Sequence, residues 1–298
     1  MSTHDNARGI AKEAASAAPG FDPRRFKAME RAGFNRIAAR YADGAHLRAD
    51  LAAALLDAAA LAPGQRVLDL ASGPGLLARD AALRVAPGGT VLATDIAEGM
   101  LAEGAHRCGE HADAPCFAAT DAEQLCLADA SVDRVLAGLA LFIFPEPERA
   151  LAEMHRVLVP GGVLALSVWG PRETVPLIHR AQDTIAHLLP PPKVQRPSVF
   201  RYGQPEALAH VLTAAGFVDI DIRTCAFSCH FDTATAYWQA FLDLAGGAAE
   251  ALGRLPQATQ DALQAAVADE LAAHRCADDR GGYLVPARTL VASARRPG

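Results

Sequence analysis

The sequence predicts an α/β protein with a doubly wound, mostly parallel sheet of about seven strands. Between residues 66 and 170, apolar runs alternate regularly with helix-forming segments, and glycine-containing turns separate them. The apolar runs are rich in Leu and β-branched residues and lack polar alternation, as expected when helices cover both faces of a parallel sheet. Such a βαβ succession defines this architecture, because each crossover returns the next strand parallel to the last one.

The first part of the alternation predicts three strands and two helices. Strands are expected at 66–72 and 90–96, where mostly apolar residues follow one another. The helix expected between them, at 76–85, is closed by the turn Ala-Pro-Gly-Gly at 86–89. A helix at 98–108 and a strand at 116–121 come next.

The second part predicts two strands around one helix. A long apolar run gives the strand at 132–142, and a helix is expected at 147–158. The turn Val-Pro-Gly-Gly at 159–162 then leads into the strand at 163–169. These elements bring the expected sheet to five strands, and the later part of the chain supplies the others.

Two flanking regions interrupt the alternation and predict helical lid segments. Residues 1–62 are expected to form an N-terminal helical segment or lid, and 63–298 the main domain. Within that domain, lid insertions are expected at about 171–203, which is rich in proline, and at about 229–280, because both are too long for simple connections. The remaining expected elements are a helix at 47–61, a helix at 204–216, a strand at 218–228, helices within 233–274 and a strand at 283–294.

The charge balance argues against a nucleic-acid partner. The chain carries 28 Lys plus Arg against 34 Asp plus Glu, a net charge of −6, and it has no basic run of the kind that binds phosphate backbones. Its longest apolar run, 135–144, is about half as long as a membrane-spanning helix. The first 20 residues lack the apolar core of a secretion signal. We therefore expect a cytoplasmic protein without a membrane span; its oligomeric state stays open, with a homodimer as one option.

Six cysteines are best interpreted as reduced thiols. They include no CxxC pair, and a chain of this size without an export signal usually keeps its thiols reduced. Cys225 and Cys229 could instead share one face of a strand and hold a soft metal, but core thiols are the simpler interpretation. No metal is expected.

The stretch VLDLASGPGLLARD, residues 67–80, predicts a ligand site at the end of the first strand. A strand, a glycine turn and a helix bring unpaired helix N–H groups and an accessible backbone together, so that an anion or a nucleotide can approach closely. Residues 73–78 also satisfy GxGxxG/A, so a dinucleotide-binding enzyme is a competing interpretation. A turn needed only for strand-to-helix packing is a third one.

Two carboxylates at strand ends strengthen the nucleotide interpretation. Asp95 ends the second strand 20 residues after Gly75, where it can accept hydrogen bonds from both hydroxyls of a ribose. Asp121 ends the third strand and, with Ala122, can frame the edge of an adenine. Each carboxylate alone is also compatible with a solvated strand end. Together with the glycine turn, the two form a specific set.

These residues resemble the class I S-adenosylmethionine-dependent methyltransferases, in the branch that includes ubiquinone and menaquinone biosynthesis methyltransferases. The resemblance spans about 105 residues and implies a Rossmann-like sheet. The family usually has a glycine where Ala71 stands here, a small change that leaves room for backbone contact. The matching stretches are VLDLASGPG at 67–75, VLATDIAEGML at 91–101, ATDAEQL at 119–125 and the segment 131–171.

The resemblance implies how S-adenosyl-L-methionine would bind. Asp69 would anchor the turn or the ammonium of the methionine moiety, the turn would lie along that moiety, and Asp95 would hold the ribose. A dinucleotide would instead place a pyrophosphate beside Asp69, which like-charge repulsion disfavours. The implied cofactor-binding set is Tyr41, Asp69, Ala71, Ser72, Gly73, Gly75 and Asp95, then Ile96 and Met100 around the adenine, Asp121 and Ala122 at its amine edge, and Ala137 and Gly138 near the sulfonium.

The methyl group of this donor is already activated, so the minimum task is to align an acceptor in line with it and to exclude water. A phenol or an activated carbon would also need a general base. His179 and His230, near the expected lids, are the candidates, although a surface or packing role is the simpler interpretation for each. No catalytic residue is assigned.

The acceptor is expected to be a small, partly apolar or aromatic metabolite that is methylated on oxygen, nitrogen or carbon. The chain has only three lysines, Lys12, Lys27 and Lys193, which disfavours a phosphate-rich acceptor. Phe142 and Trp169 are expected at strand ends, where open α/β sheets bind ligands, and are predicted substrate-pocket residues with core packing as the alternative. An NAD(P)-dependent oxidoreductase and a non-catalytic nucleoside-binding relative remain open alternatives.

Overall fold

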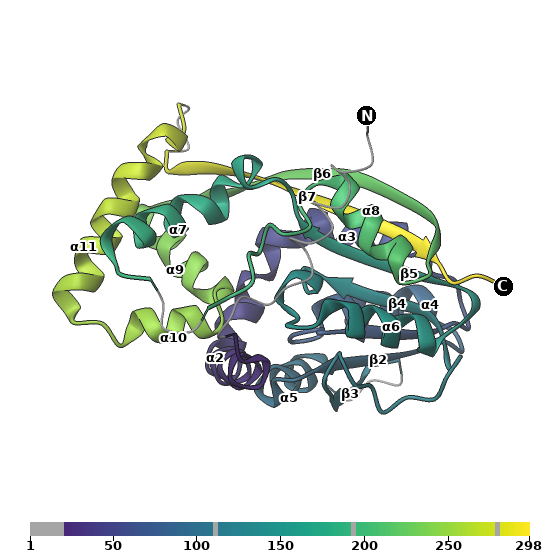
Figure 1. Ribbon diagram of the computed structural model, residues 1–298. Helices are drawn as coiled ribbons and strands as arrows, with labels where there is room; N and C mark the ends of the chain where they lie inside the picture. Colours follow the sequence, from purple (N-terminus) through teal and green to yellow (C-terminus); the bar gives the residue numbers. More distant parts are fainter. Residues whose placement is uncertain (1–20, 110–112, 192–194, 278–280) are drawn as a thin grey trace, which may run out of the picture.

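The computed structural model describes residues 21–109, 113–191, 195–277 and 281–298, which form a seven-stranded sheet with helices on both faces and a helical lobe beyond one end (Figure 1). The strand order is β3-β2-β1-β4-β5-β7-β6. All neighbours from β3 to β5 pair in parallel, and β7 runs antiparallel to both β5 and β6. The predicted doubly wound sheet is confirmed. The strands are β1 (Arg66–Leu70), β2 (Thr90–Asp95), β3 (Cys116–Ala119), β4 (Val132–Gly138), β5 (Leu158–Trp169), β6 (Val218–Phe231) and β7 (Tyr283–Arg295).

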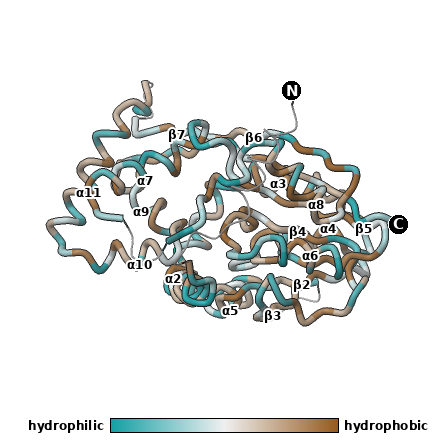
Figure 2. The backbone as a smooth tube through the Cα atoms, viewed as in Figure 1, coloured by the Kyte–Doolittle hydropathy of each residue, from teal (hydrophilic) through white to brown (hydrophobic). Residues whose placement is uncertain are grey.

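The crossover helices begin and end close to the predicted residues. They are α4 (Leu76–Val85), α5 (Glu98–Cys108), α6 (Pro147–Val157) and α8 (Pro205–Ala214). Both α6 and α8 start at a proline, which suits the first helical position because no N–H is needed there. The core lies between these helices and the sheet, and hydrophobic stretches follow the central strands (Figure 2).

Several strand boundaries differ from the prediction. β1 ends at Leu70, β6 continues to Phe231, and β3 ends at Ala119, so Asp121 follows the third strand instead of ending it. The fourth strand ends at Gly138, because Leu139 adopts a left-handed backbone (φ 51°) and a short 3₁₀ helix, Leu141–Ile143, follows. The fifth strand starts earlier than expected, at Leu158. Its pairing with β4 jumps from Val132–Leu158 to Arg134–Val163, so the expected turn at 159–162 is an irregularity within β5.

The N-terminal segment forms two helices, α2 (Pro23–Asp43) and α3 (Ala49–Ala58), joined by a 3₁₀ turn at Gly44–Arg48. Asp22 caps α2, since its carboxylate accepts the N–H groups of Arg24 and Arg25. Helix α3 packs on the sheet, whereas α2 packs against α5 and α10 (Gly247–Gly253). The segment thus covers the sheet with one helix and extends toward the lobe with the other.

The helical lobe consists of α7 (Pro176–Leu188), α9 (Ala234–Leu244), α10 and α11 (Gln257–Glu270), on the left of Figure 1. Helix α11 packs on α7 and α9. Strands β6 and β7 continue to pair as far as Phe231–Tyr283, well beyond the last pair of β7 with β5 at Trp169–Thr289. A two-stranded ribbon therefore leaves the sheet, and α9 to α11 connect its two strands.

The lid boundaries at 1–62, 171–203 and 229–280 stay predictions, and each of these ranges includes residues outside the described ones. The first contains α2 and α3, the second α7, and the third α9 to α11. In the part of the chain that the structure describes, no helix combines the length and the apolar character needed to cross a membrane.

Candidate functional site

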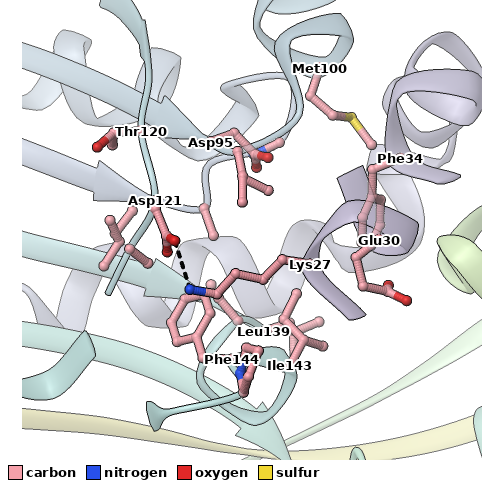
Figure 3. A pocket seen from close by; sticks show the side chains of 18 of the residues that line it. Lys27, Glu30, Phe34, Asp95, Met100, Thr120, Asp121, Leu139, Ile143 and Phe144 are labelled. Carbon is pink, nitrogen blue, oxygen red and sulfur yellow. Dashed lines mark hydrogen bonds and ion pairs between the residues drawn. The ribbon is translucent and has the colours of Figure 1, made fainter. Parts of the chain in front are cut away.

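A pocket lies at the carboxyl ends of β1 to β4, with α2 as one wall (Figure 3). Because β1 lies between β2 and β4, the chain leaves the sheet in opposite directions on its two sides, which opens a crevice at this point. The space amounts to about 800 Å³, part of it open to solvent. The lining residues are Phe26, Lys27, Glu30, Phe34 and Tyr41 of α2; Leu70, Ala71 and Gly73 after β1; Asp95, Ile96 and Met100 after β2; Thr120, Asp121 and Ala122 after β3; and Gly138, Leu139, Ala140, Ile143, Phe144 and Pro145 after β4.

The glycine turn uses its two glycines differently. Gly73 and Gly75 both have a positive φ, of 55° and 67°, a conformation that costs other residues about 1 kcal/mol or more. A Cβ on Gly73 would lie 3.5 Å from Cε1 of Tyr41, in ordinary contact, whereas a Cβ on Gly75 would lie 2.6 Å from Cε1 of Phe117. Gly73 therefore faces the pocket, and Gly75 lets the turn pack on β3.

Asp95 joins the end of β2 to this turn. One carboxylate oxygen accepts the N–H of Gly73 at 2.9 Å, and the other accepts the N–H of Ala97 at 2.8 Å. Burial raises the pKa of Asp95, although these N–H groups and that of Ile96 act in the opposite direction. A carboxylate has about four acceptor positions. Asp95 thus keeps capacity for hydrogen bonds from a ligand in the pocket.

Asp69 lies beneath the turn and is only 1% exposed. Burial raises its pKa to about 8, the N–H of Ala78 acts against this, and the charge of Asp95 adds a smaller upward effect. Its Oδ2 is buried without a hydrogen-bond partner among the described residues. Such an atom is costly unless a donor reaches it, so Asp69 is suited to interact with a cationic group bound at the turn.

At the other end of the pocket, Lys27 of α2 contacts two carboxylates. Its ammonium lies 2.6 Å from Oδ2 of Asp121 (Figure 3) and also pairs with Glu123. Among the described residues that line the pocket, Lys27 is the only cation. The pairing joins α2 to the loop after β3, although the residues are more than 90 positions apart in the chain.

Aromatic and aliphatic side chains form much of the remaining wall. Phe34 and Tyr41 pack edge to face with ring centroids 6.1 Å apart, and the guanidinium of Arg48 lies 4.5 Å from the Tyr41 ring centroid. On the opposite side, Ile143 and Phe144 follow β4. The pocket is therefore apolar on two sides and carries its charges at both ends.

The structure brings most of the predicted cofactor-binding residues to this pocket and leaves others behind it. Ser72 donates its backbone N–H to Thr94 at 2.9 Å, and Ala137 is fully buried in β4. The predicted residues in the lining are Tyr41, Ala71, Gly73, Asp95, Ile96, Met100, Asp121, Ala122 and Gly138, and those outside it are Asp69, Ser72, Gly75 and Ala137. Their roles toward a ligand stay predictions.

The predicted substrate-pocket and base residues do not line the pocket. Phe142 was expected to end the fourth strand, which is wrong, because it lies in the 3₁₀ helix and packs in the core, 5% exposed. Trp169 ends β5 as expected but is buried. His179 lies 3.2 Å from Asp183 on its own helix, and His230 contacts the Gly281 carbonyl at 3.1 Å.

Sequence reasoning missed Lys27, Glu30 and the residues that follow β4. The rarity of lysine could have indicated Lys27, since the chain has only three lysines. Glu30 is buried, which raises its pKa, and it pairs with Arg196 at 2.8 Å. These partners are distant in the chain, so periodicity along one helix cannot reveal them.

The alternative metal site at Cys225 and Cys229 is not supported. Both residues lie on the extended strand β6, where four residues span about 13 Å, too far for two ligands of one ion. Cys229 is buried, and its Sγ contacts the Leu47 carbonyl at 3.4 Å. All six cysteines have free thiols.

Residues 68–166 match the family model described as "Methyltransferase domain". A ubiquinone/menaquinone biosynthesis C-methyltransferase of Bordetella avium is 45% identical over 102 residues, which cover 34% of this chain and 40% of that protein. A demethylmenaquinone methyltransferase of Clavibacter sepedonicus is 33% identical over 178 residues, which cover 55% of this chain and 71% of that protein. The chain therefore spans less than half the length of the first of these relatives.

Solved structures share the fold. A phosphoethanolamine N-methyltransferase 2 of Haemonchus contortus, in complex with S-adenosyl-L-methionine, aligns with a TM-score of 0.52 at 20% identity over 84% of this chain and 53% of that one. The YcgJ protein of Bacillus subtilis aligns with a TM-score of 0.52 at 16% identity over 83% of this chain and 98% of that one. At these identities the likeness concerns the fold alone.

The sheet order and the position of the pocket define a doubly wound α/β protein whose ligand site lies at the carboxyl ends of the strands. The relatives make the assignment more specific. The chain belongs to the class I S-adenosylmethionine-dependent methyltransferases, in the branch of the ubiquinone and menaquinone biosynthesis methyltransferases.

Proposed function

We propose that the protein transfers a methyl group from S-adenosyl-L-methionine to a small, partly apolar or aromatic acceptor. One observation carries the proposal: a single pocket contains the glycine turn at Gly73, the Asp95 carboxylate and the Asp121 carboxylate in succession. These groups suit the three parts of one ligand, with the methionine moiety at the turn, the ribose at Asp95 and the adenine amine at Asp121.

The donor also fits two details of the turn. Its ammonium would give the unpartnered Oδ2 of Asp69 a charged hydrogen-bond donor. Its methionine moiety would lie against the backbone of Gly73, which has no side chain of its own to block the approach.

The bound donor supplies a methyl group on a positively charged sulfur. The protein has to hold the acceptor in line with that methyl group and to keep water away. The methyl group forms its bond to the acceptor while the electrons of the broken bond return to sulfur, and any proton on the attacking atom is released. Helix α2 supports the exclusion of water, because Phe26 and Phe34 place aromatic surface on the pocket.

The acceptor class follows from the remaining lining. Ile143, Phe144 and Pro145 present apolar surface after β4, which suits a hydrophobic or aromatic ring. The matched relatives carry names of quinone biosynthesis, so a quinol precursor methylated on carbon belongs among the acceptors. The net charge of −6 supports a metabolite rather than a nucleic acid.

Thermal unfolding with different ligands tests the donor. S-adenosylhomocysteine at about 100 times its dissociation constant should stabilise the protein by roughly 2.7 kcal/mol, while NAD and NADP should leave it unchanged. Stabilisation by a dinucleotide alone would contradict the proposal. A panel of quinols, phenols, amines and thiols with labelled methyl donor then tests turnover, and a failure of every acceptor despite donor binding would favour a non-catalytic role.

A further inference from the structure

Lys27 occupies a position between two walls of the pocket. Its side chain runs from α2 across to the loop after β3, where the ammonium contacts Asp121 (Figure 3) and also Glu123. Only 21% of the side chain is exposed. A lysine on a solvated helix face extends into water, so the burial of the Lys27 side chain indicates specific partners inside the protein.

Glu123 gives the first reason. Its side chain is 2% exposed, and its Oε1 accepts the N–H of Glu146, at the start of α6, at 2.7 Å. Its other oxygen pairs with Lys27. A carboxylate this deeply buried is costly without a counter-charge, and Lys27 provides one; Arg201 adds a more distant positive charge.

Asp121 gives the second reason. Its Oδ1 accepts the N–H of Glu123 at 3.0 Å, and its Oδ2 accepts the Lys27 ammonium at 2.6 Å. Both oxygens are thus held, and the orientation of the carboxylate is fixed although a third of the side chain is exposed. Each oxygen retains a lone pair, so the fixed carboxylate can accept a further hydrogen bond from the pocket.

We propose that Lys27 is a positioning residue for the methyl donor: it aims Asp121 at the adenine amine and holds α2 against the bound nucleoside. The inference rests on the proposed function, because it assigns the adenine to this end of the pocket. The coupling has a structural basis, since Phe26, Glu30 and Phe34 lie on the same helix and line the same pocket. Loss of the Lys27 ammonium would therefore loosen both the Asp121 carboxylate and helix α2.

The test compares two ligands that differ at one group. S-adenosylhomocysteine carries the adenine amine, and S-inosylhomocysteine carries a carbonyl oxygen in its place, which a carboxylate repels. The wild-type protein should prefer the adenosyl ligand by about tenfold or more in calorimetry, as expected for a hydrogen bond to a charged group. In Lys27→Met the preference should fall to about threefold or less, and Lys27→Arg should restore most of it.

Arg31→Met is the matched control. Arg31 lies on the same helix and pairs with Glu98 of α5, but both side chains are about half exposed, so the pair contributes little. The control should keep the wild-type preference. Hydrogen exchange without ligand gives a second readout: the amides of 22–43 should exchange faster in Lys27→Met than in Arg31→Met.

Lys27→Met leaves Glu123 buried without its partner and so risks unfolding. The double variant Lys27→Met/Glu123→Gln removes that charge while the amide oxygen can still accept the N–H of Glu146. It should fold and still fail to discriminate the two ligands. An equal loss for both ligands, or tighter binding of S-adenosylhomocysteine in Lys27→Met, would overturn the positioning role. If the wild-type protein bound neither ligand, the proposed function itself would fail.

Discussion

The backbone N–H of Gly73 donates a hydrogen bond to the carboxylate of Asp95 over 2.9 Å. This contact joins the turn after β1 to the end of β2, and the second oxygen of Asp95 accepts the N–H of Ala97. Asp95 therefore holds the glycine turn in place and also lines the same pocket. Ligand affinity and local stability should depend on this residue together.

Replacing Asp95 by Ala should weaken S-adenosylhomocysteine binding by roughly ten- to a hundredfold, because hydrogen bonds to a charged acceptor contribute about 1.5 to 3 kcal/mol each. It should also lower the melting temperature, since two N–H groups lose their acceptor. Calorimetry and thermal unfolding measure the two effects. Asp80→Ala, at a partly exposed position on α4, should change neither. Unchanged donor affinity in Asp95→Ala would remove Asp95 from the site.

The two glycines of the turn should respond differently to substitution. Gly75→Ala should destabilise the protein more than Gly73→Ala, because its Cβ would lie 2.6 Å from Phe117 while the φ angles of the two residues are similar. Gly73→Val should instead abolish donor binding in a protein that still folds. Chemical unfolding and calorimetry on the variants separate the two effects; native donor affinity in folded Gly73→Val would contradict the assignment of this turn.

Asp69 should make stability fall as pH rises. Its pKa is about 8 in the folded protein against 3.8 ordinarily, so between these values the folded state holds a proton that the unfolded state has lost. The free energy of unfolding then decreases by about 1.4 kcal/mol per pH unit in this window. Asp69→Asn cannot ionise and should become progressively more stable than the wild-type protein from about pH 5 to pH 8. If the free energies of unfolding of the two proteins changed in parallel with pH, Asp69 would have an ordinary pKa and the prediction would be wrong.

Arg196 should stabilise the contact between α2 and the segment that follows α7. It pairs with Glu30, whose side chain is only 10% exposed, at 2.8 Å, and loss of one partner of a buried pair costs about 3 kcal/mol. Arg196→Met should lower the free energy of unfolding by about this amount, and Arg196→Met/Glu30→Gln should recover most of it.

The control for this pair is Arg254→Met, because Arg254 pairs with Glu250 while 73% exposed. Its effect should stay within about 0.5 kcal/mol in the same denaturant titrations. Equal effects of Arg196→Met and Arg254→Met would mean that the Glu30 pair is not a buried one in solution.

The sequence was informative wherever a local pattern decides the structure. Alternating apolar runs and turn residues located the strands and the crossover helices, because the periodicity of burial differs between the two. The same reasoning identified Gly73 and Asp95, since a turn and a strand end have fixed places in a doubly wound sheet. Gly73 and Asp95 both line the pocket, whereas Ser72 and Gly75 of the same turn do not.

What the sequence did not predict depends on distant pairing. The run through Phe142 looks like one strand, but the chain turns at Leu139, where the backbone N–H reaches Ser167 of the neighbouring strand. Lys27 meets Asp121 only because α2 folds back over the sheet. Neither contact leaves a periodic signal, so a single sequence contains too little information to find it.

The ribbon formed by β6 and β7 has a consequence for how this architecture can diversify. Its strands remain hydrogen-bonded as far as Phe231 and Tyr283, so the two ends of the inserted α9 to α11 stay neighbours whatever the helices between them are. An insertion anchored in this way can be exchanged for another of different length or shape without altering the register of the sheet. The helices at the tip of the ribbon can thus change while the sheet and the pocket at the carboxyl ends of β1 to β4 keep their geometry.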